Sequence, residues 1–104
     1  MRLMIKATLP TEAMNEFVAN GSIEEKMAAV LQDLKPESVY FGISGGRRTA
    51  WIVVNTEDGS QSLPAIAEPL FLTFNAQLEI SPVMTPEDLG AAGPDLAAAA
   101  QKYG

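Results

Sequence analysis

The stretch 38–56, SVYFGISGGRRTAWIVVNT, constrains the fold more than any other part of the chain. It contains two runs of β-branched and aromatic residues that are separated by Gly45 and Gly46. A Gly-Gly pair between such runs is typical of a tight β-hairpin, because the primed turns need residues that adopt positive φ. We therefore predict a hairpin, and if the two glycines form its turn, Tyr40 lies opposite Trp51; a four-residue loop would keep the same partition of side chains.

This pairing sorts the hairpin side chains onto two faces, because successive residues of a strand point to opposite sides of the sheet. One face is entirely apolar and comprises Val39, Phe41, Ile43, Ala50, Ile52 and Val54. The other face is mixed and comprises Ser38, Tyr40, Gly42, Thr49, Trp51, Val53 and Asn55. A loop with an odd number of residues would move one strand to the other face, so the clean sorting favours an even loop.

Hydrophobic periodicity predicts the remaining elements. Alternation predicts strands at 3–9 and 75–83, and the second has one polar face that suits a sheet edge. Helical spacing predicts a crossover between the first strand and the hairpin that is broken at Asn20-Gly21. It also predicts a helix from Leu63 to about Phe74.

Several local signals refine these elements. Ser22 and Glu25 match a capping box at the start of the second helix of the crossover. Pro69 predicts a kink or an early end in the helix that begins near Leu63. Thr85 followed by Pro86 is typical of a helix start, and an alanine-rich helix at about 95–102 ends the chain.

The order of elements predicts the α+β class and a ferredoxin-like βαββαβ fold. Short right-handed connections give an antiparallel four-stranded sheet with the first and third strands in the centre and the helices on one face. We predict a domain at 1–84 and an extra C-terminal helical tail at 85–104, packed on the domain or on a partner subunit. The residues expected beneath the helices are Leu3, Ile5, Phe41, Ile52, Val54, Leu78 and Ile80.

The other face of the sheet, called the open face below, is the candidate ligand site or interface. It is expected to collect Met4, Lys6, Tyr40, Trp51, Val53, Gln77 and Glu79. Tyrosine and tryptophan each bury on the order of 150–250 Å² when they are packed, and an apolar patch of several hundred Å² usually marks an interaction site. The cover is expected to be a second copy, a bound ligand or the tail of the same chain.

Composition narrows the chemistry. The 104 residues include no cysteine and no histidine, which excludes a histidine base and the usual zinc sites, and we predict no metal and no cofactor. The net charge of −6 makes nucleic acid and anionic membranes poor partners. No stretch reads as a signal peptide or a transmembrane helix, so we expect a cytoplasmic protein.

Two charged pairs are candidate polar sites. Arg47 and Arg48 form the only basic pair and match a weak anion-binding site, although a solvated turn flank is the favoured interpretation. Lys6 and Glu79 are expected to meet on adjacent strands of the open face. They would hold a polar ligand or act as acid and base, although an ion pair at an interface or sheet edge is the favoured interpretation.

A βαββαβ chain of about this length with a half-apolar open face resembles the dimeric α+β barrel superfamily. The segments LKPESVYF, GRRTAWIVV and FNAQLEISPVMTPEDL look most like its short bacterial members of uncharacterised function, and the resemblance covers about 1–83. It implies a homodimer joined through the open face that acts as a small-molecule binding or protein-interaction module. The alternative is a cofactor-free isomerase or monooxygenase that acts on a small hydrophobic carbonyl compound in the inter-sheet cavity, with Lys6, Tyr40 and Glu79 as polar groups.

Overall fold

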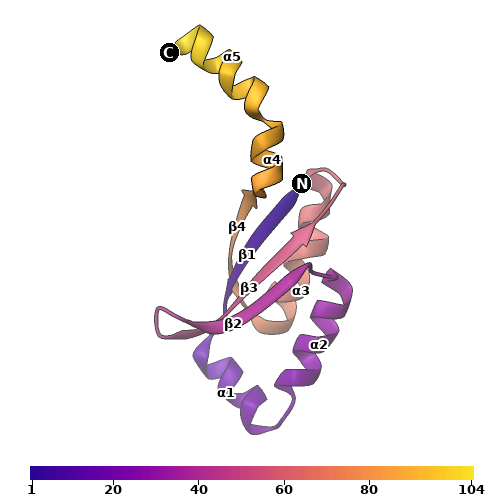
Figure 1. Ribbon diagram of the computed structural model, residues 1–104. Helices are drawn as coiled ribbons and strands as arrows, with labels where there is room; N and C mark the ends of the chain where they lie inside the picture. The colour runs from indigo at the N-terminus through magenta and orange to yellow at the C-terminus, as the bar shows by residue number, and fades with distance from the viewer.

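The computed structural model describes residues 1–104 and contains one antiparallel sheet whose strand order is β2-β3-β1-β4. Helices lie against one face of this sheet, and a helical arm leaves from the end of β4 (Figure 1). The α+β ferredoxin-like fold with β1 and β3 in the centre is therefore confirmed. In chain order the elements are β1 (Arg2–Thr8), α1 (Thr11–Ala19), α2 (Ile23–Leu34), β2 (Ser38–Ser44), β3 (Arg47–Asn55), a short 3₁₀ turn (Ser60–Ser62), α3 (Leu63–Phe74), β4 (Gln77–Val83), α4 (Pro86–Ala91) and α5 (Gly93–Tyr103).

The hairpin has the predicted register. Tyr40 lies opposite Trp51, and Ser44 lies opposite Arg47, so only two residues form the turn. These are the two glycines between the strands, with φ values of +60° and +75°. Side chains larger than hydrogen are disfavoured at positive φ, which explains why the sequence has glycine at both positions.

The core lies between the sheet and the helices. Its centre is formed by Ile5 and Ile52 of the sheet, Met14 of α1, and Leu70 and Phe74 of α3, which are almost completely buried. Each fully buried side chain of this size contributes about 1.5–3 kcal/mol through the hydrophobic effect. Only one face of the sheet is covered in this way.

The apolar face of the hairpin extends beyond the helices. Phe41 is 60% exposed and Ile43 is 78% exposed, so the prediction that Phe41 lies beneath the helices is wrong. Both residues belong to β2, which is an edge strand. The periodicity assigned them to the correct face of the sheet but could not show how far across that face the helices reach.

The junction between α1 and α2 differs from the predicted capping box. Ser22 has helical dihedral angles and its side chain makes no cap hydrogen bond. Its backbone N–H instead donates to the carbonyl oxygen of Phe17, and that of Gly21 donates to Val18. This pair of bonds is the Schellman motif, which ends α1 and holds Ser22 outside the extended geometry that an N-cap needs.

Helix α3 runs through Pro69 to Phe74, so the proline does not shorten it. The missing N–H costs one intrahelical hydrogen bond, and the burial of Leu70 and Phe74 offsets this loss. Asn75 then adopts a left-handed conformation with φ of +53° and ends the helix. As a result β4 begins at Gln77, two residues later than predicted.

The helices α4 and α5 form the arm and project away from the sheet (Figure 1). The molecule measures 59 × 28 × 20 Å and its radius of gyration is 17.2 Å, whereas a compact chain of this length would have about 13 Å. Helix α5 contains no buried residue. No helix of the chain has both the length and the apolar character that crossing a membrane requires.

Candidate functional site

The open face holds all seven side chains that the sequence assigned to it. The register brings them together because Lys6 of β1 lies opposite Trp51 of β3 on one side and opposite Glu79 of β4 on the other. Met4 and Val53 are also opposite each other, one pair further along. The full set is Met4, Lys6, Tyr40, Trp51, Val53, Gln77 and Glu79.

The indole of Trp51 lies across β2 at the position of a glycine. A Cβ atom at Gly42 would lie 3.1 Å from Cζ3 and 3.7 Å from Cη2 of Trp51. The absence of a side chain at Gly42 therefore lets the ring approach the sheet, and Trp51 is half-buried although no other element covers it. Thr49, the strand partner of Gly42, is only 2% exposed. The aromatic centre of the open face is thus a preformed flat surface.

Lys6 occupies the middle of the open face. It is half-buried. No carboxylate lies within ion-pair distance of its Nζ, and the ion pairs of the chain all involve Arg2. Glu79 is its strand partner but is exposed and makes no ion pair. The predicted Lys6–Glu79 ion pair is therefore absent within one chain, although the two residues are neighbours as expected.

The two arginines of the hairpin point to opposite faces of the sheet, because they are adjacent in one strand. Arg48 turns toward the helices, where its Nη1 donates a hydrogen bond of 3.0 Å to Oδ1 of Asn15. Arg47 is exposed and lines a polar cavity of about 510 Å³ together with Thr8 and Gln77. The pair therefore does not form a single anion clamp.

Hollows lie at both ends of the open face rather than in its centre. The cavity beside Arg47 is at one end, and a second cavity of about 450 Å³ at the other end is lined in part by Arg2 and Val83. Trp51, Lys6 and Tyr40 line neither of them. A ligand on the central residues would therefore be enclosed only if another molecule covered the face.

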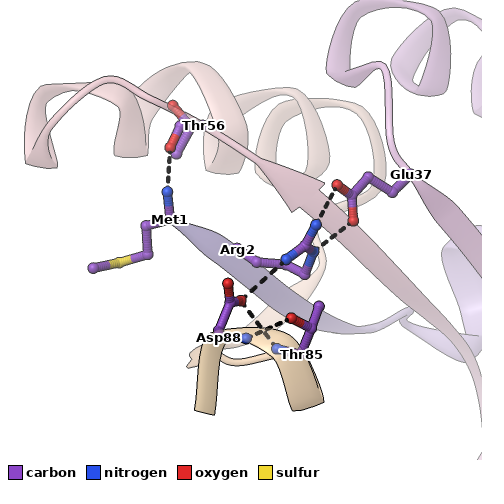
Figure 2. A network of polar contacts seen from close by, with 6 residues as sticks. All are labelled: Met1, Arg2, Glu37, Thr56, Thr85 and Asp88. Atoms are coloured by element: carbon purple, nitrogen blue, oxygen red, sulfur yellow. Dashed lines mark hydrogen bonds and ion pairs between the residues drawn. The ribbon is translucent and has the colours of Figure 1, made fainter. Parts of the chain in front are cut away.

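An ion-pair network fixes the end of the open face where the arm begins (Figure 2). Arg2 Nε and Nη2 donate to the two carboxylate oxygens of Glu37 at 2.7 and 2.9 Å, and Nη1 lies 3.3 Å from Oδ2 of Asp88 in α4. The hydrogen bond with Glu37 raises the pKa of Arg2, and the same bond lowers the pKa of Glu37.

Asp88 also completes a capping box. Its backbone N–H donates to Oγ1 of Thr85, and the N–H of Thr85 donates back to its carboxylate. The hydrogen bonds from Thr85, and then the charge of Arg2, lower the pKa of Asp88. Thr85 was predicted as a helix start, whereas the contacts among Arg2, Glu37 and Asp88 were not predicted. The T-x-x-D spacing was the available signal for the cap, whereas nothing in the sequence indicated the partners of Arg2.

No group of three His, Cys, Asp or Glu side chains converges in a way that would hold a metal ion. Fold and face together define a class: a ferredoxin-like α+β domain with an aromatic sheet face that nothing in the single chain covers.

Comparison with solved structures supports this class. The chain is similar to 5-chloro-2-hydroxyhydroquinone dehydrochlorinase, TftG, from Burkholderia phenoliruptrix AC1100, solved in complex with 2,5-dihydroxybenzoquinone. The TM-score is 0.59 at 11% sequence identity, and the match covers 84% of this chain and 97% of TftG. At this identity the likeness concerns the fold. No protein-family model and no curated protein matches the chain.

Proposed function

We propose that the protein is a homodimer that joins two open faces and binds a small planar carbonyl or hydroxylated ring compound between them. The observation that carries this proposal is the uncovered centre of the open face, where Trp51 and Tyr40 lie beside the half-buried Lys6. Leaving such a patch in water forgoes about 25 cal/mol for each Å² of apolar surface. A second copy is the cover that the resemblance to dimeric α+β barrels implies.

The chemistry of the ligand follows from the groups on the face. The indole of Trp51, held against Gly42, offers a flat surface on which a ring can stack. The ammonium group of Lys6, which lacks an ion-pair partner in the chain, suits a phenolate or a quinone oxygen. The dihydroxybenzoquinone bound to TftG belongs to this chemical class and supports the choice of probe.

The dimer is tested with a matched pair of variants. Val53→Glu introduces a charge at the centre of the open face, and Ile43→Glu introduces the same charge at an exposed strand residue on the opposite face. We expect the dissociation constant of the dimer, measured by sedimentation or light scattering, to rise at least about tenfold for Val53→Glu only, since burying an unpaired charge is costly. A monomeric parent protein, or equal effects of the two variants, would contradict the proposed interface.

Binding is tested by calorimetric titration with 2,5-dihydroxybenzoquinone. A hydrogen bond to a charged group contributes about 1.5–3 kcal/mol, so Lys6→Met should weaken binding by about 10- to 100-fold. Lys26→Met is the control, because Lys26 lies on α2, away from the open face. Absence of binding, or equal losses in both variants, would rule out this ligand class at the open face.

The second candidate is a cofactor-free isomerase or monooxygenase that acts on a small hydrophobic carbonyl compound at the same place. The half-buried Lys6, which makes no ion pair, favours it, because such an amine can exchange a proton with a bound substrate. Turnover of a bound carbonyl compound that Lys6→Met abolishes would support the enzyme, and binding without turnover would support the binding module.

A further inference from the structure

The arm formed by α4 and α5 makes almost no contact with its own domain. All of its helical residues from Gly93 onward are outside the core, and none of them is buried. A helix of 11 residues is marginally stable in water when it packs on nothing, since such helices usually gain their stability from tertiary contacts. The arm therefore lacks the packing that normally keeps a short helix folded.

The base of the arm is nevertheless held in a definite direction. The Thr85–Asp88 capping box begins α4, and the contact of 3.3 Å between Arg2 and Asp88 attaches that helix to β1 (Figure 2). Arg2 is itself held by Glu37 through two hydrogen bonds. Three separate segments of the chain thus fix how the arm leaves the sheet, which a disordered tail would not need.

The large apolar residues of the two arm helices recur at intervals of seven residues. Leu96, Ala99 and Tyr103 lie on one side of α5 at helical spacing, and Leu89 of α4 lies seven residues before Leu96; Leu89, Leu96 and Tyr103 are called the stripe below. The larger three are 49%, 57% and 78% exposed. The opposite side of α5 carries Pro94, Ala98 and Gln101 and no large apolar side chain. The two large side chains that α5 could bury against another surface, Leu96 and Tyr103, therefore lie on the same side of the helix.

The molecule that the structure favours as the packing partner of the arm is a second copy of the chain. The arm starts beside the open face, because Val83, Arg2 and Asn55 form the last row of that face and Arg2 contacts α4. Any molecule that covers the face therefore comes close to the arm. Four strands of about seven residues have a flat footprint on the order of 450 Å². The arm adjoins this footprint, so a second copy on the face could extend its contact onto the arm.

We infer that the arm of each subunit packs through the Leu89–Leu96–Tyr103 stripe on the other subunit of the dimer. The inference rests on the proposed open-face homodimer and adds to it the element that completes the interface. It also assigns a function to the Arg2–Glu37–Asp88 network, which aims the arm.

The test compares two charged substitutions on α5. Leu96→Glu places a carboxylate in the stripe, and Ala98→Glu places the same group on the opposite side of the same helix. We expect Leu96→Glu to raise the dissociation constant of the dimer at least about tenfold, while Ala98→Glu leaves it within about twofold of the parent protein. Amide hydrogen exchange in α5 should slow with rising protein concentration in the parent protein and in Ala98→Glu, but not in Leu96→Glu.

The outcomes separate this inference from the proposed dimer. If the parent chain is dimeric and sensitive to Val53→Glu, but Leu96→Glu behaves like Ala98→Glu, the dimer stands and the inference about the arm is wrong. If the parent chain is monomeric at every concentration, both fail. A loss of dimer with Leu96→Glu and concentration-dependent protection of α5 supports both.

Discussion

The two faces of the same sheet differ in how far they are buried in the single chain. On the helix side Ile5, Ala7 and Ile52 are completely buried, whereas on the open face their sequence neighbours Met4 and Lys6 remain partly in contact with water. Both faces contain large apolar residues, so hydrophobicity alone does not distinguish them. The difference is that three helices of the chain cover one face and nothing in the chain covers the other.

In the proposed function, folding depends on one face of the sheet and association on the other. The helix face determines whether the chain folds, because its residues form the one core of the domain. In the proposed function the open face is the surface that binds a partner, because its groups are arranged by the strands but are not used by the core. Changes on the two faces should therefore separate stability from association.

The largest expected effect comes from substitution of adjacent residues on β3. Ile52→Ala removes completely buried methyl and methylene groups and should lower the free energy of unfolding by about 2–5 kcal/mol. Val53 is the next residue in the strand and lies on the open face. Val53→Ala should lower the free energy of unfolding by at most about 1 kcal/mol in dilute protein. Chemical denaturation at two protein concentrations checks this, and the loss for Val53→Ala should grow with concentration if the open face is shared. Equal losses for both variants in dilute protein would contradict the division between the faces.

A smaller effect is expected where Gly42 gives space to Trp51. A methyl group at this position would lie 3.1 Å from the indole, so Gly42→Ala should push the ring outward. We expect red-shifted emission from the single tryptophan and stronger quenching by iodide, with a stability change below about 1 kcal/mol. Gly90→Ala is the control, because a Cβ atom there meets nothing within 4 Å. Unchanged emission in Gly42→Ala would mean that the ring is not held against β2.

The hairpin could be predicted from the sequence because its signals are local. The pair Gly45-Gly46 predicted the register of the hairpin, and the alternation along all four strands predicted which residues share the open face. The position of Lys6 opposite Trp51 comes from the pairing of β1 with β3 and was not predicted. The prediction that failed, the burial of Phe41, depended on how helices and strands are placed relative to one another. The exposure of Phe41 follows from where the helices end on the sheet, which no local pattern encodes.

The same reason explains the ion-pair network that was not predicted and the capping box at Ser22 that was predicted wrongly. Glu37 and Asp88 lie 35 and 86 positions after Arg2 in the sequence. The three residues meet only because the sheet brings the start of the chain beside both segments. At Ser22 two local patterns competed, since the residue suits both a helix start and the end of a Schellman motif. The sequence could not decide between them, because the choice depends on how closely α1 and α2 are joined. Where the arm packs stays a prediction for a comparable reason, as its contacts within the chain are few.

The smallest expected effect concerns the charges that join the arm to the sheet. Glu37 and Asp88 have lowered pKa values in the folded protein, so their contribution to stability is complete above the ordinary carboxyl pKa of about 4 and is lost as the pH falls through the lowered values. Arg2→Met removes the cation, so part of this acid-dependent loss should disappear. Stability should differ between the parent protein and the variant at pH 6 and converge toward pH 2.

Thermal unfolding across this pH range measures the effect, and Lys35→Met is a matched control because Lys35 makes no ion pair. If the arm is aimed by this network, Arg2→Met should also weaken the dimer at pH 6 more than the control does, although less than Leu96→Glu. A variant that changes acid stability without changing association would confine Arg2 to its own chain. The contrast between the two sheet faces would still hold, but the Arg2–Glu37–Asp88 network would no longer explain how the arm is directed toward a partner.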